Sequence, residues 1–511
     1  MSASGQQGSP AAFPLDEATV QQLQEAMAAG RYTSRRLVEL YSERINAIDR
    51  SGPTLRSVIE LNPEALSIAD ALDAERKKGR VRGPLHGIPV LIKDNIDTGD
   101  RMMTTAGSLA LQGAPASRDA FIVGKLRAGG AVILGKTNLS EWANFRSTKS
   151  TSGWSGRGGK VHNPYALDRN PCGSSSGTGA AIAANLAAIG VGTETDGSIV
   201  CPSGANSLVG IKPTIGLVSR SGIIPISHSQ DTAGPMTRTV SDAAVLLGAM
   251  AGVDPDDRST VTGRKVTDYT AALKADGLKG ARIGIARKKY FGYSPVTDKL
   301  IDAAIAEMKS QGAVIIDPAD VPTAAQLDDC EFEVLLYEFK ADLNKYLASR
   351  SSAAVHSLKD LIAFNERERE REMPFFGQEI LVSAEKKGPL TSPAYRKALA
   401  TCRTRARGLG VDAVMTKFRL DALVAPTGSP AWPTDLVNGD HFTGASSTPA
   451  AVAGYPSVTV PAGFAFGLPV GLSFIGRPWS EARLISLAYA YEQATKHRRP
   501  PTFAQTALLK N

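Results

Sequence analysis

Two serine-containing turns and one lysine have the residue types that a serine nucleophile and its base require. Lys93 ends the apolar run 87–92, where burial would lower the pKa of its ammonium group and leave an amine that can act as a base. Ser174 lies in the Gly/Ser-rich turn 173–179, and Ser198 follows a second glycine-containing turn. Lysine with serine is a known alternative to the histidine of serine hydrolases. The competing interpretation is that the serines belong to solvated loops and the lysine to the surface.

Two other patterns compete for neighbouring segments. Residues 130–137 match the phosphate-loop pattern GxxxxGK[ST], but the four middle residues, Ala-Val-Ile-Leu, favour a buried strand over an open turn. Residues 173–177 match GxSxG around Ser175, a pattern that forms a nucleophile elbow when it follows a strand. The preceding segment, 163–172, is polar and rich in turn residues instead. We therefore favour the lysine–serine interpretation over a nucleotide site and over a histidine-dependent triad.

Helices and short apolar strands alternate along the chain and must position these side chains. A small-residue helix is predicted over 178–189, directly after the first serine turn. The last two predicted strands are joined by residues 461–469 alone, too few for a crossover helix, which indicates a mixed sheet. We predict one large α/β domain over residues 15–511, with a mixed central sheet covered by helices, and a flexible tail over residues 1–14. Further helices are predicted over 295–311, 323–349 and 480–496, and strands over 131–134, 282–286, 313–316, 422–425, 457–460 and 470–474.

The composition of the 511 residues is that of a soluble globular protein, with 42% hydrophobic, 21% charged and 6% aromatic residues. The net charge of +8 is small for this length, and the basic run 496–499 lacks interleaved aromatic residues, so no nucleic-acid partner is expected. No apolar window is long enough to predict a membrane span. The N-terminus lacks a signal-peptide pattern, which predicts a cytoplasmic location as written, or a periplasmic or secreted one if a signal peptide was removed.

The cysteines and histidines show no metal-binding pattern. Neither a CxxC pair nor an HExxH motif occurs, and the six histidines are scattered. We expect no metal, no cofactor and no disulfide framework. The four cysteines are Cys172, Cys201, Cys330 and Cys402.

Several ordered motifs resemble the amidase signature family. They are residues 87–95 (GIPVLIKDN), 130–138 (GAVILGKTN), 173–177 (GSSSG), 192–199 (GTETDGSI), 210–214 (GIKPT), 231–235 (DTAGP), 421–427 (DALVAPT) and 454–461 (GYPSVTVP). The resemblance extends from about residue 16 to the end of the chain. It is specific because the motifs occur together and in order.

The resemblance implies a Ser–cisSer–Lys triad. In it Lys93 is the base, Ser174 is the bridging serine after a cis peptide bond, and Ser198 is the nucleophile that forms an acyl-enzyme. Ser175 and Asp231 would support the proton relay by hydrogen bonding. The oxyanion hole would consist of backbone N–H groups of Thr195, Asp196, Gly197 and Ser198. Trp142, Ala143 and Asn144 would line the substrate cleft, although Trp142 could equally be a packed core residue.

Three positions depart from the family pattern. Glu194 stands where the family has aspartate, and Asp196 stands where it has glycine. Val200 stands where the family has arginine, which makes small acidic amides poor candidates for the substrate. Residues 140–154, 172–181 and 194–202 resemble bacterial peptide amidases, which convert the C-terminal carboxamide of a peptide to the acid and ammonia. The resemblance thus implies a small peptide amide as the substrate and no membrane partner. The oligomeric state is left open, a monomer being compatible with the sequence.

Three alternatives remain open. The chain could be a broad aliphatic or aryl amidase. It could be a subunit of a transfer-RNA amidotransferase, which would require a partner subunit. It could also be a non-catalytic amidase-like binding protein, but the presence of both serines and the lysine in full motifs argues against this.

Overall fold

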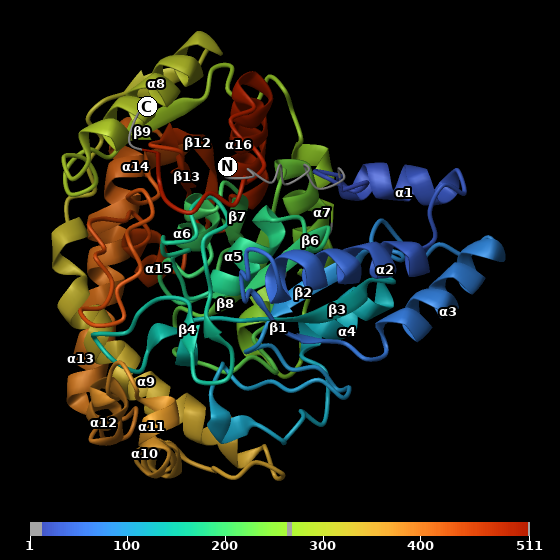
Figure 1. Ribbon diagram of the computed structural model, residues 1–511. Coiled ribbons are helices and arrows are strands. Elements are labelled where there is room, and N and C mark those ends of the chain that lie inside the picture. Colours follow the sequence, from blue (N-terminus) through green and yellow to red (C-terminus); the bar gives the residue numbers. More distant parts are fainter. Residues whose placement is uncertain (1–12, 263–267, 509–511) are drawn as a thin grey trace, which may run out of the picture.

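An eleven-stranded mixed sheet forms the centre of the computed structural model, which describes residues 13–262 and 268–508 (Figure 1). The strand order is β1-β3-β2-β6-β8-β7-β12-β13-β11-β9-β10. The strands are β1 (Val58–Leu61), β2 (Pro89–Lys93), β3 (Val132–Thr137), β6 (Ile189–Glu194), β7 (Val209–Lys212), β8 (Thr232–Thr237), β9 (Arg282–Ile285), β10 (Val314–Ile316), β11 (Ala422–Pro426), β12 (Ser457–Ala465) and β13 (Leu468–Ile475), while β4 (Trp154–Ser155) and β5 (Gly159–Lys160) form a separate pair.

Parallel and antiparallel pairs occur side by side, as the short connection between the last two strands predicts. Strand β2 is parallel to both β3 and β6, and β9 is parallel to both β10 and β11. Strands β12 and β13 form an antiparallel hairpin. The predicted single α/β domain with a mixed central sheet is therefore confirmed. The predicted tail, residues 1–14, lies outside the described residues except for its last two positions.

Helices cover both faces of the sheet. They are α1 (Val20–Ala28), α2 (Ser34–Arg44), α3 (Ala65–Lys77), α4 (Phe121–Ala128), α5 (Ser176–Ala183), α6 (Val200–Ala205), α7 (Val240–Met250), α8 (Pro295–Ser310), α9 (Asp328–Ala348), α10 (Leu358–Arg367), α11 (Arg369–Glu372), α12 (Glu379–Glu385), α13 (Pro393–Ala406), α14 (Asp412–Phe418), α15 (Thr448–Ala453) and α16 (Glu481–Thr495). None of the helices in the described part of the chain has the length and apolar character needed to cross a membrane.

The helix predicted over 178–189 is shorter than expected, and its last residue is the first residue of a strand. Helix α5 ends at Ala183, and β6 begins at Ile189. Gly190 of this strand packs directly on the helix, because a side chain there would begin 2.7 Å from Ile182. The small residues that suggested a longer helix therefore serve the close packing of α5 against β6 instead.

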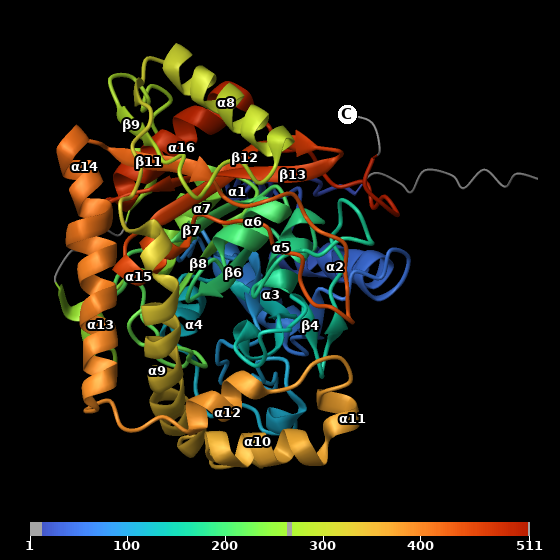
Figure 2. The same ribbon diagram turned by 90° about the vertical axis from the view of Figure 1, so that its left-hand side faces the viewer.

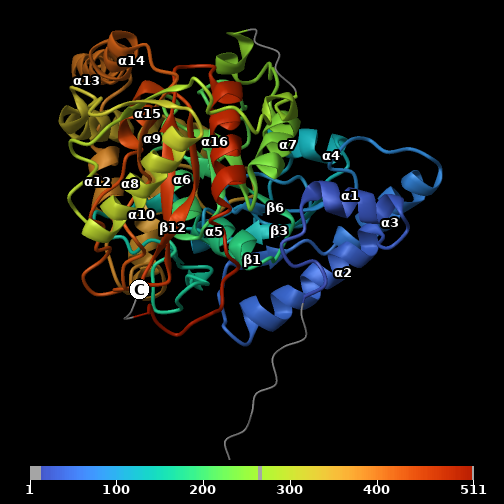
Figure 3. The same ribbon diagram turned by 90° about the horizontal axis from the view of Figure 1, so that it is seen from above.

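The helices form separate groups around the sheet. Figure 2 shows α9 running toward the group of α10, α11 and α12, with which it shares an apolar cluster that is distinct from the main core. In Figure 3, α1, α2 and α3 lie together at the end of the molecule away from α13 and α14. The α9–α12 group faces the site described below and supplies part of its wall.

All four cysteines are paired, and the expectation of no disulfide framework is wrong. Cys172 pairs with Cys201 across 29 residues of sequence, and Cys330 pairs with Cys402 across 72. The fold brings these partners together from distant segments. Spacing along the chain does not reveal such pairs.

Candidate active site

Lys93 is the last residue of β2 and is completely buried. Its Nζ lies 2.8 Å from the Oγ of Ser174 and 2.9 Å from the Oγ1 of Thr193. Burial lowers the pKa of Lys93 to about 7, although the negative charges of Asp231 and Glu194 oppose this shift. A large share of the lysine is therefore uncharged near neutral pH, and its amine lies within hydrogen-bond distance of a serine hydroxyl.

Ser174 follows a cis peptide bond from Gly173. The turn has no room for a side chain at Gly173, because a Cβ there would lie 2.2 Å from the Oγ of Ser140. The backbone N–H of Ser140 also donates to the carbonyl oxygen of Ser174 at 3.1 Å. Ser140 therefore contacts both residues of this turn.

Ser175 connects the turn to β6 and to the second serine segment. Its Oγ donates to the carbonyl oxygen of Thr193 at 3.0 Å, and its N–H donates to the carbonyl oxygen of Ser198 at 3.2 Å. Strands β2 and β6 are parallel neighbours, so their carboxyl ends lie at the same edge of the sheet. Lys93 thereby meets Ser174, which lines one cavity together with Ser198.

The segment between β6 and α6 presents free backbone N–H groups. Within the described chain, no acceptor receives a hydrogen bond from the N–H of Asp196, Gly197 or Ser198. Gly197 has a φ of 80°, a left-handed conformation that glycine adopts readily. Successive unpaired N–H groups in such a turn can bind a negatively charged oxygen.

Glu194 explains one departure from the family pattern. Its carboxylate accepts hydrogen bonds from the N–H groups of Ile199 and Val200, at 2.8 and 3.0 Å, at the start of α6. These donors have no partner within the helix. Glu194 thus fixes the direction in which α6 leaves the Ser198 segment, and its longer side chain serves this purpose well.

Asp231 holds the other side of the same segment. Its Oδ1 accepts a hydrogen bond from the Oγ1 of Thr195 at 2.6 Å, and its Oδ2 accepts from the N–H groups of Ile226 and Ser227, each at 2.8 Å. Burial raises the pKa of Asp231 to about 6, against the effect of these hydrogen bonds. The carboxylate links the 226–231 loop to Thr195, which begins the turn with the free N–H groups.

A cavity of about 500 Å³ opens in front of the two serines. It is lined by Ser174, by residues 195–198 and by apolar side chains from distant parts of the chain, and among its described lining residues there is no lysine or arginine. Val200 is part of this wall. The apolar lining residues are Phe145, Ile226, Leu335, Ile380, Trp432 and Phe442.

The three predicted cleft residues have different positions. Ala143 and Asn144 line the cavity. Trp142 is only 1% exposed and packs in the α9–α12 apolar cluster, so the structure places it in the core and not at the cleft. Sequence reasoning missed Thr193, which contacts Lys93, and most of the far wall. The position of Thr193 at the end of β6 is the one signal that could have indicated it.

A family model for amidases, described simply as Amidase, matches residues 36–485. The chain belongs to the amidase family. This amidase is 54% identical to the native peptide amidase from Stenotrophomonas maltophilia, over 96% of this chain and 99% of that one, with a TM-score of 0.93. It is 43% identical to a probable amidase of Arabidopsis thaliana, over 96% of this chain and 92% of that protein. It is also 36% identical to a glutamyl-tRNA(Gln) amidotransferase subunit from Alkalilimnicola ehrlichii, over 95% and 99% of the two chains.

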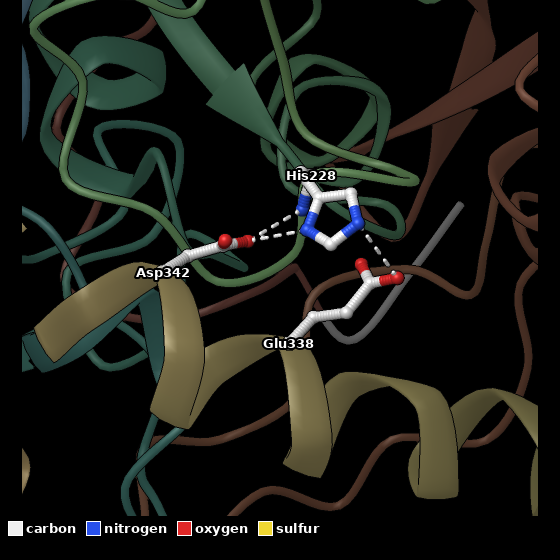
Figure 4. A group of neighbouring side chains, drawn as sticks. All are labelled: His228, Glu338 and Asp342. Carbon is white, nitrogen blue, oxygen red and sulfur yellow. Dashed lines mark hydrogen bonds and ion pairs between the residues drawn. The ribbon is translucent and has the colours of Figure 1, made fainter. Parts of the chain in front are cut away.

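A second cavity of the amidase, of about 710 Å³, adjoins the first but does not include the two serines. Its lining includes Asp231 and His228. Figure 4 shows the His228 ring between two carboxylates of α9: Nδ1 lies 2.8 Å from Asp342, and Nε2 lies 3.3 Å from Glu338. The carboxylates contact opposite edges of the ring. The geometry is that of a histidine held between two carboxylates, which ties the 226–231 loop to α9.

Proposed function

We propose that this amidase hydrolyses the C-terminal carboxamide of peptides to the free acid and ammonia, with Ser198 as nucleophile. The observation that carries the proposal is the buried Lys93 with its Nζ 2.8 Å from Ser174, beside a cavity that also exposes Ser198. The similarity to the Stenotrophomonas peptide amidase supports the substrate class.

The contacts of Lys93 support its role as the base. An uncharged amine has two N–H groups and one lone pair. The carbonyl oxygen and the Oγ1 of Thr193, at 3.3 and 2.9 Å, can accept the two N–H groups. The lone pair then faces the hydroxyl of Ser174. Thr193 therefore orients the amine for proton transfer.

The reaction follows as a relay of protons. Lys93 takes the proton of Ser174 while Ser174 takes the proton of Ser198, whose Oγ attacks the carbonyl carbon of the amide. The negative charge that develops on the carbonyl oxygen is stabilised by the free N–H groups of residues 196–198. Ser174 then returns a proton to the leaving nitrogen, and ammonia departs. Water hydrolyses the acyl-enzyme by the reverse relay.

The cavity supports a neutral peptide as the acyl group. Its apolar residues can contact varied side chains, and it has no cationic group to anchor an acidic amide. Helix α5 is buried along its whole length behind Ser174, which leaves little space on that side. Ammonia fits such a leaving-group side better than the rest of a polypeptide does.

The test combines a nucleophile assignment with a substrate panel. Ser198→Ala should reduce kcat by at least about 10⁴-fold, because the acyl group loses its attachment atom. A fluorophosphonate should label the wild-type enzyme at Ser198 alone, and Ser175→Ala, a matched control, should still be labelled. Labelling at Ser175 would overturn the assignment.

The panel compares a blocked dipeptide amide, the free amino-acid amide, an aryl anilide, glutamine and the dipeptide extended by one residue. We expect the blocked dipeptide amide to be hydrolysed fastest and internal peptide bonds to remain intact. A preference for glutamine would instead support the amidotransferase alternative. Internal cleavage at a comparable rate would show that the leaving-group side is open.

A further inference from the structure

The Cys172–Cys201 disulfide joins the two segments that carry the serines of the site. Cys172 directly precedes the Gly173–Ser174 turn, and Cys201 lies in the first turn of α6, shortly after Ser198. Their Cα atoms are 6.0 Å apart. A single covalent bond therefore joins the residue before the Gly173–Ser174 turn to a residue that follows Ser198.

Among the described residues, two hydrogen bonds join residues 171–175 directly to residues 198–206. The N–H of Ser175 donates to the Ser198 carbonyl at 3.2 Å, and the Nδ2 of Asn206 donates to the Pro171 carbonyl at 2.9 Å. No hydrogen bond between the side chains of Ser174 and Ser198 occurs in the described structure. The relative position of the two hydroxyl groups therefore depends on the backbone that carries them.

The backbone at Cys172 needs such a constraint. Its φ of 58° lies in the left-handed region, which residues with a side chain seldom adopt. Cys172 is only 4% exposed, and both cysteines pack with Trp432 and line the cavity. The disulfide thus fixes an unfavourable backbone conformation at the residue that precedes the Gly173–Ser174 turn.

We propose that the Cys172–Cys201 disulfide is a positioning element of the active site, which holds Ser174 and Ser198 at the separation that proton transfer requires. The proposal rests on the proposed function in one respect, the assignment of these two serines. A loss of the bridge should leave substrate binding largely intact, because the far wall of the cavity does not depend on it. The rate of attack by Ser198 should fall.

The second disulfide provides a matched control. Cys330–Cys402 joins α9 to α13, is buried, and does not line the cavity. It closes a longer loop than Cys172–Cys201, so chain entropy predicts that its loss reduces stability at least as much. A purely structural role for both bridges would therefore make the control variant the more impaired of the two.

The experiment compares the double variants C172S/C201S and C330S/C402S with the wild-type enzyme. For C172S/C201S we expect kcat to fall by about 10- to 100-fold, a range typical of a small misplacement of reacting groups, with a much smaller change in KM. The rate of fluorophosphonate labelling at Ser198 should fall in parallel. For C330S/C402S we expect an equal or larger decrease in Tm, with kcat and labelling close to the wild-type values.

Wild-type kcat and labelling in C172S/C201S would overturn the proposal. Since labelling does not depend on which amide is hydrolysed, its loss supports the proposal even where the proposed substrate class fails. If C172S/C201S does not fold, the folded wild-type enzyme is reduced with a phosphine. The phosphine is oxidised to its oxide with oxygen from water, and two thiols form, which are located by alkylation and mass spectrometry. Unchanged activity with Cys172 and Cys201 reduced would then overturn the proposal.

Discussion

Two buried lysines on neighbouring parallel strands have opposite environments. Lys136 of β3 pairs in register with Ile92, while Lys93 of β2 pairs with Thr137, so the two lysines are offset by one residue. Because side chains alternate along a strand, they point to opposite faces of the sheet. Lys93 meets the serine turn, whereas the Nζ of Lys136 donates to the Oγ1 of Thr104 at 2.8 Å and to the carbonyl of Ile96.

The difference shows that burial alone does not make a lysine a base. Burial lowers the pKa of both side chains, but Lys136 has Asp94 and Asp97 as its main charged neighbours and no serine partner. Its role is to compensate buried carboxylates. Lys93 has Asp231 and Glu194 as its charged neighbours, and it faces a hydroxyl group. The Ser174 hydroxyl, and not burial alone, therefore distinguishes Lys93 from Lys136.

Replacing each lysine by methionine separates the two roles most strongly. Lys93→Met should reduce kcat by about 10²–10⁴-fold, the usual contribution of positioned acid–base catalysis. Its stability should be unchanged or higher at neutral pH, because the folded state no longer has to keep an amine deprotonated. Lys136→Met should lose about 1–3 kcal/mol of stability, since it removes one of the positive charges beside Asp94 and Asp97 and leaves the acceptors of its hydrogen bonds unpaired. Thermal unfolding measures the stability of both variants, and steady-state kinetics measures their kcat. A loss of stability in Lys93→Met with a loss of kcat in Lys136→Met would contradict the assigned roles.

Lys93→Arg tests whether the charge or the base is needed. Arginine keeps its proton at any working pH and cannot accept another. We expect this variant to be about as inactive as Lys93→Met, within the same range of about 10²–10⁴-fold. Substantial activity of the arginine variant in the same amide assay would show that a positive charge suffices.

The pH dependence sharpens the role of the charges around Lys93. With a pKa of about 7, the wild-type kcat/KM should rise with pH up to that region, as Lys93 loses its proton. Burial lowers this pKa and Asp231 raises it, so Asp231→Asn should move the acidic limb to lower pH. The carbonyl oxygen of asparagine can still accept from the N–H groups of Ile226 and Ser227, and its Nδ2 can donate to the Thr195 hydroxyl, so kcat should fall by no more than about tenfold. If the acidic limb of the kcat/KM profile stays at the same pH in Asp231→Asn, a group other than Lys93 controls it.

His228→Gln should have the smallest effect. Burial lowers the pKa of His228, but the hydrogen bond to Asp342 and the charge of Glu338 outweigh it and raise the pKa. The stabilisation is therefore fully present at pH below the ordinary histidine pKa and is lost as pH rises through the raised value. Because the ring is partly exposed, the variant should lose about 1 kcal/mol or less at pH 5.5 and less still at pH 9. An equal loss at both pH values would exclude a charged ring.

The serine and lysine positions could be predicted because each lies at the end of a strand or turn with a distinctive local sequence. Lys93 follows an apolar strand, and both serines follow glycine-containing turns. The mixed sheet could be predicted because only residues 461–469 join the last two predicted strands. These features depend on residues that are close together in the sequence, so local sequence patterns indicate them.

The remaining parts of the site depend on contacts between distant segments. The cavity wall near Leu335 and Ile380 comes from α9 and α12, and the wall near Trp432 comes from a loop after β11. Local patterns do not indicate which helix packs over which strand end. The disulfide partners were missed for the same reason, and the choice between cleft and core for Trp142 stayed open.

Helix α5 follows the Ser174 turn and limits protein engineering there, although none of the described residues that line the cavity belongs to it. All of its residues are buried, and a side chain at Gly177 would begin 2.4 Å from the carbonyl oxygens of Asn138 and Ser57. Variant libraries in this helix should yield few folded members. The cavity wall includes side chains such as Leu335, Ile380 and Phe442, which can be exchanged with less disturbance of the backbone. Selections for new acyl groups should therefore be enriched in substitutions on that wall, while α5 stays unchanged.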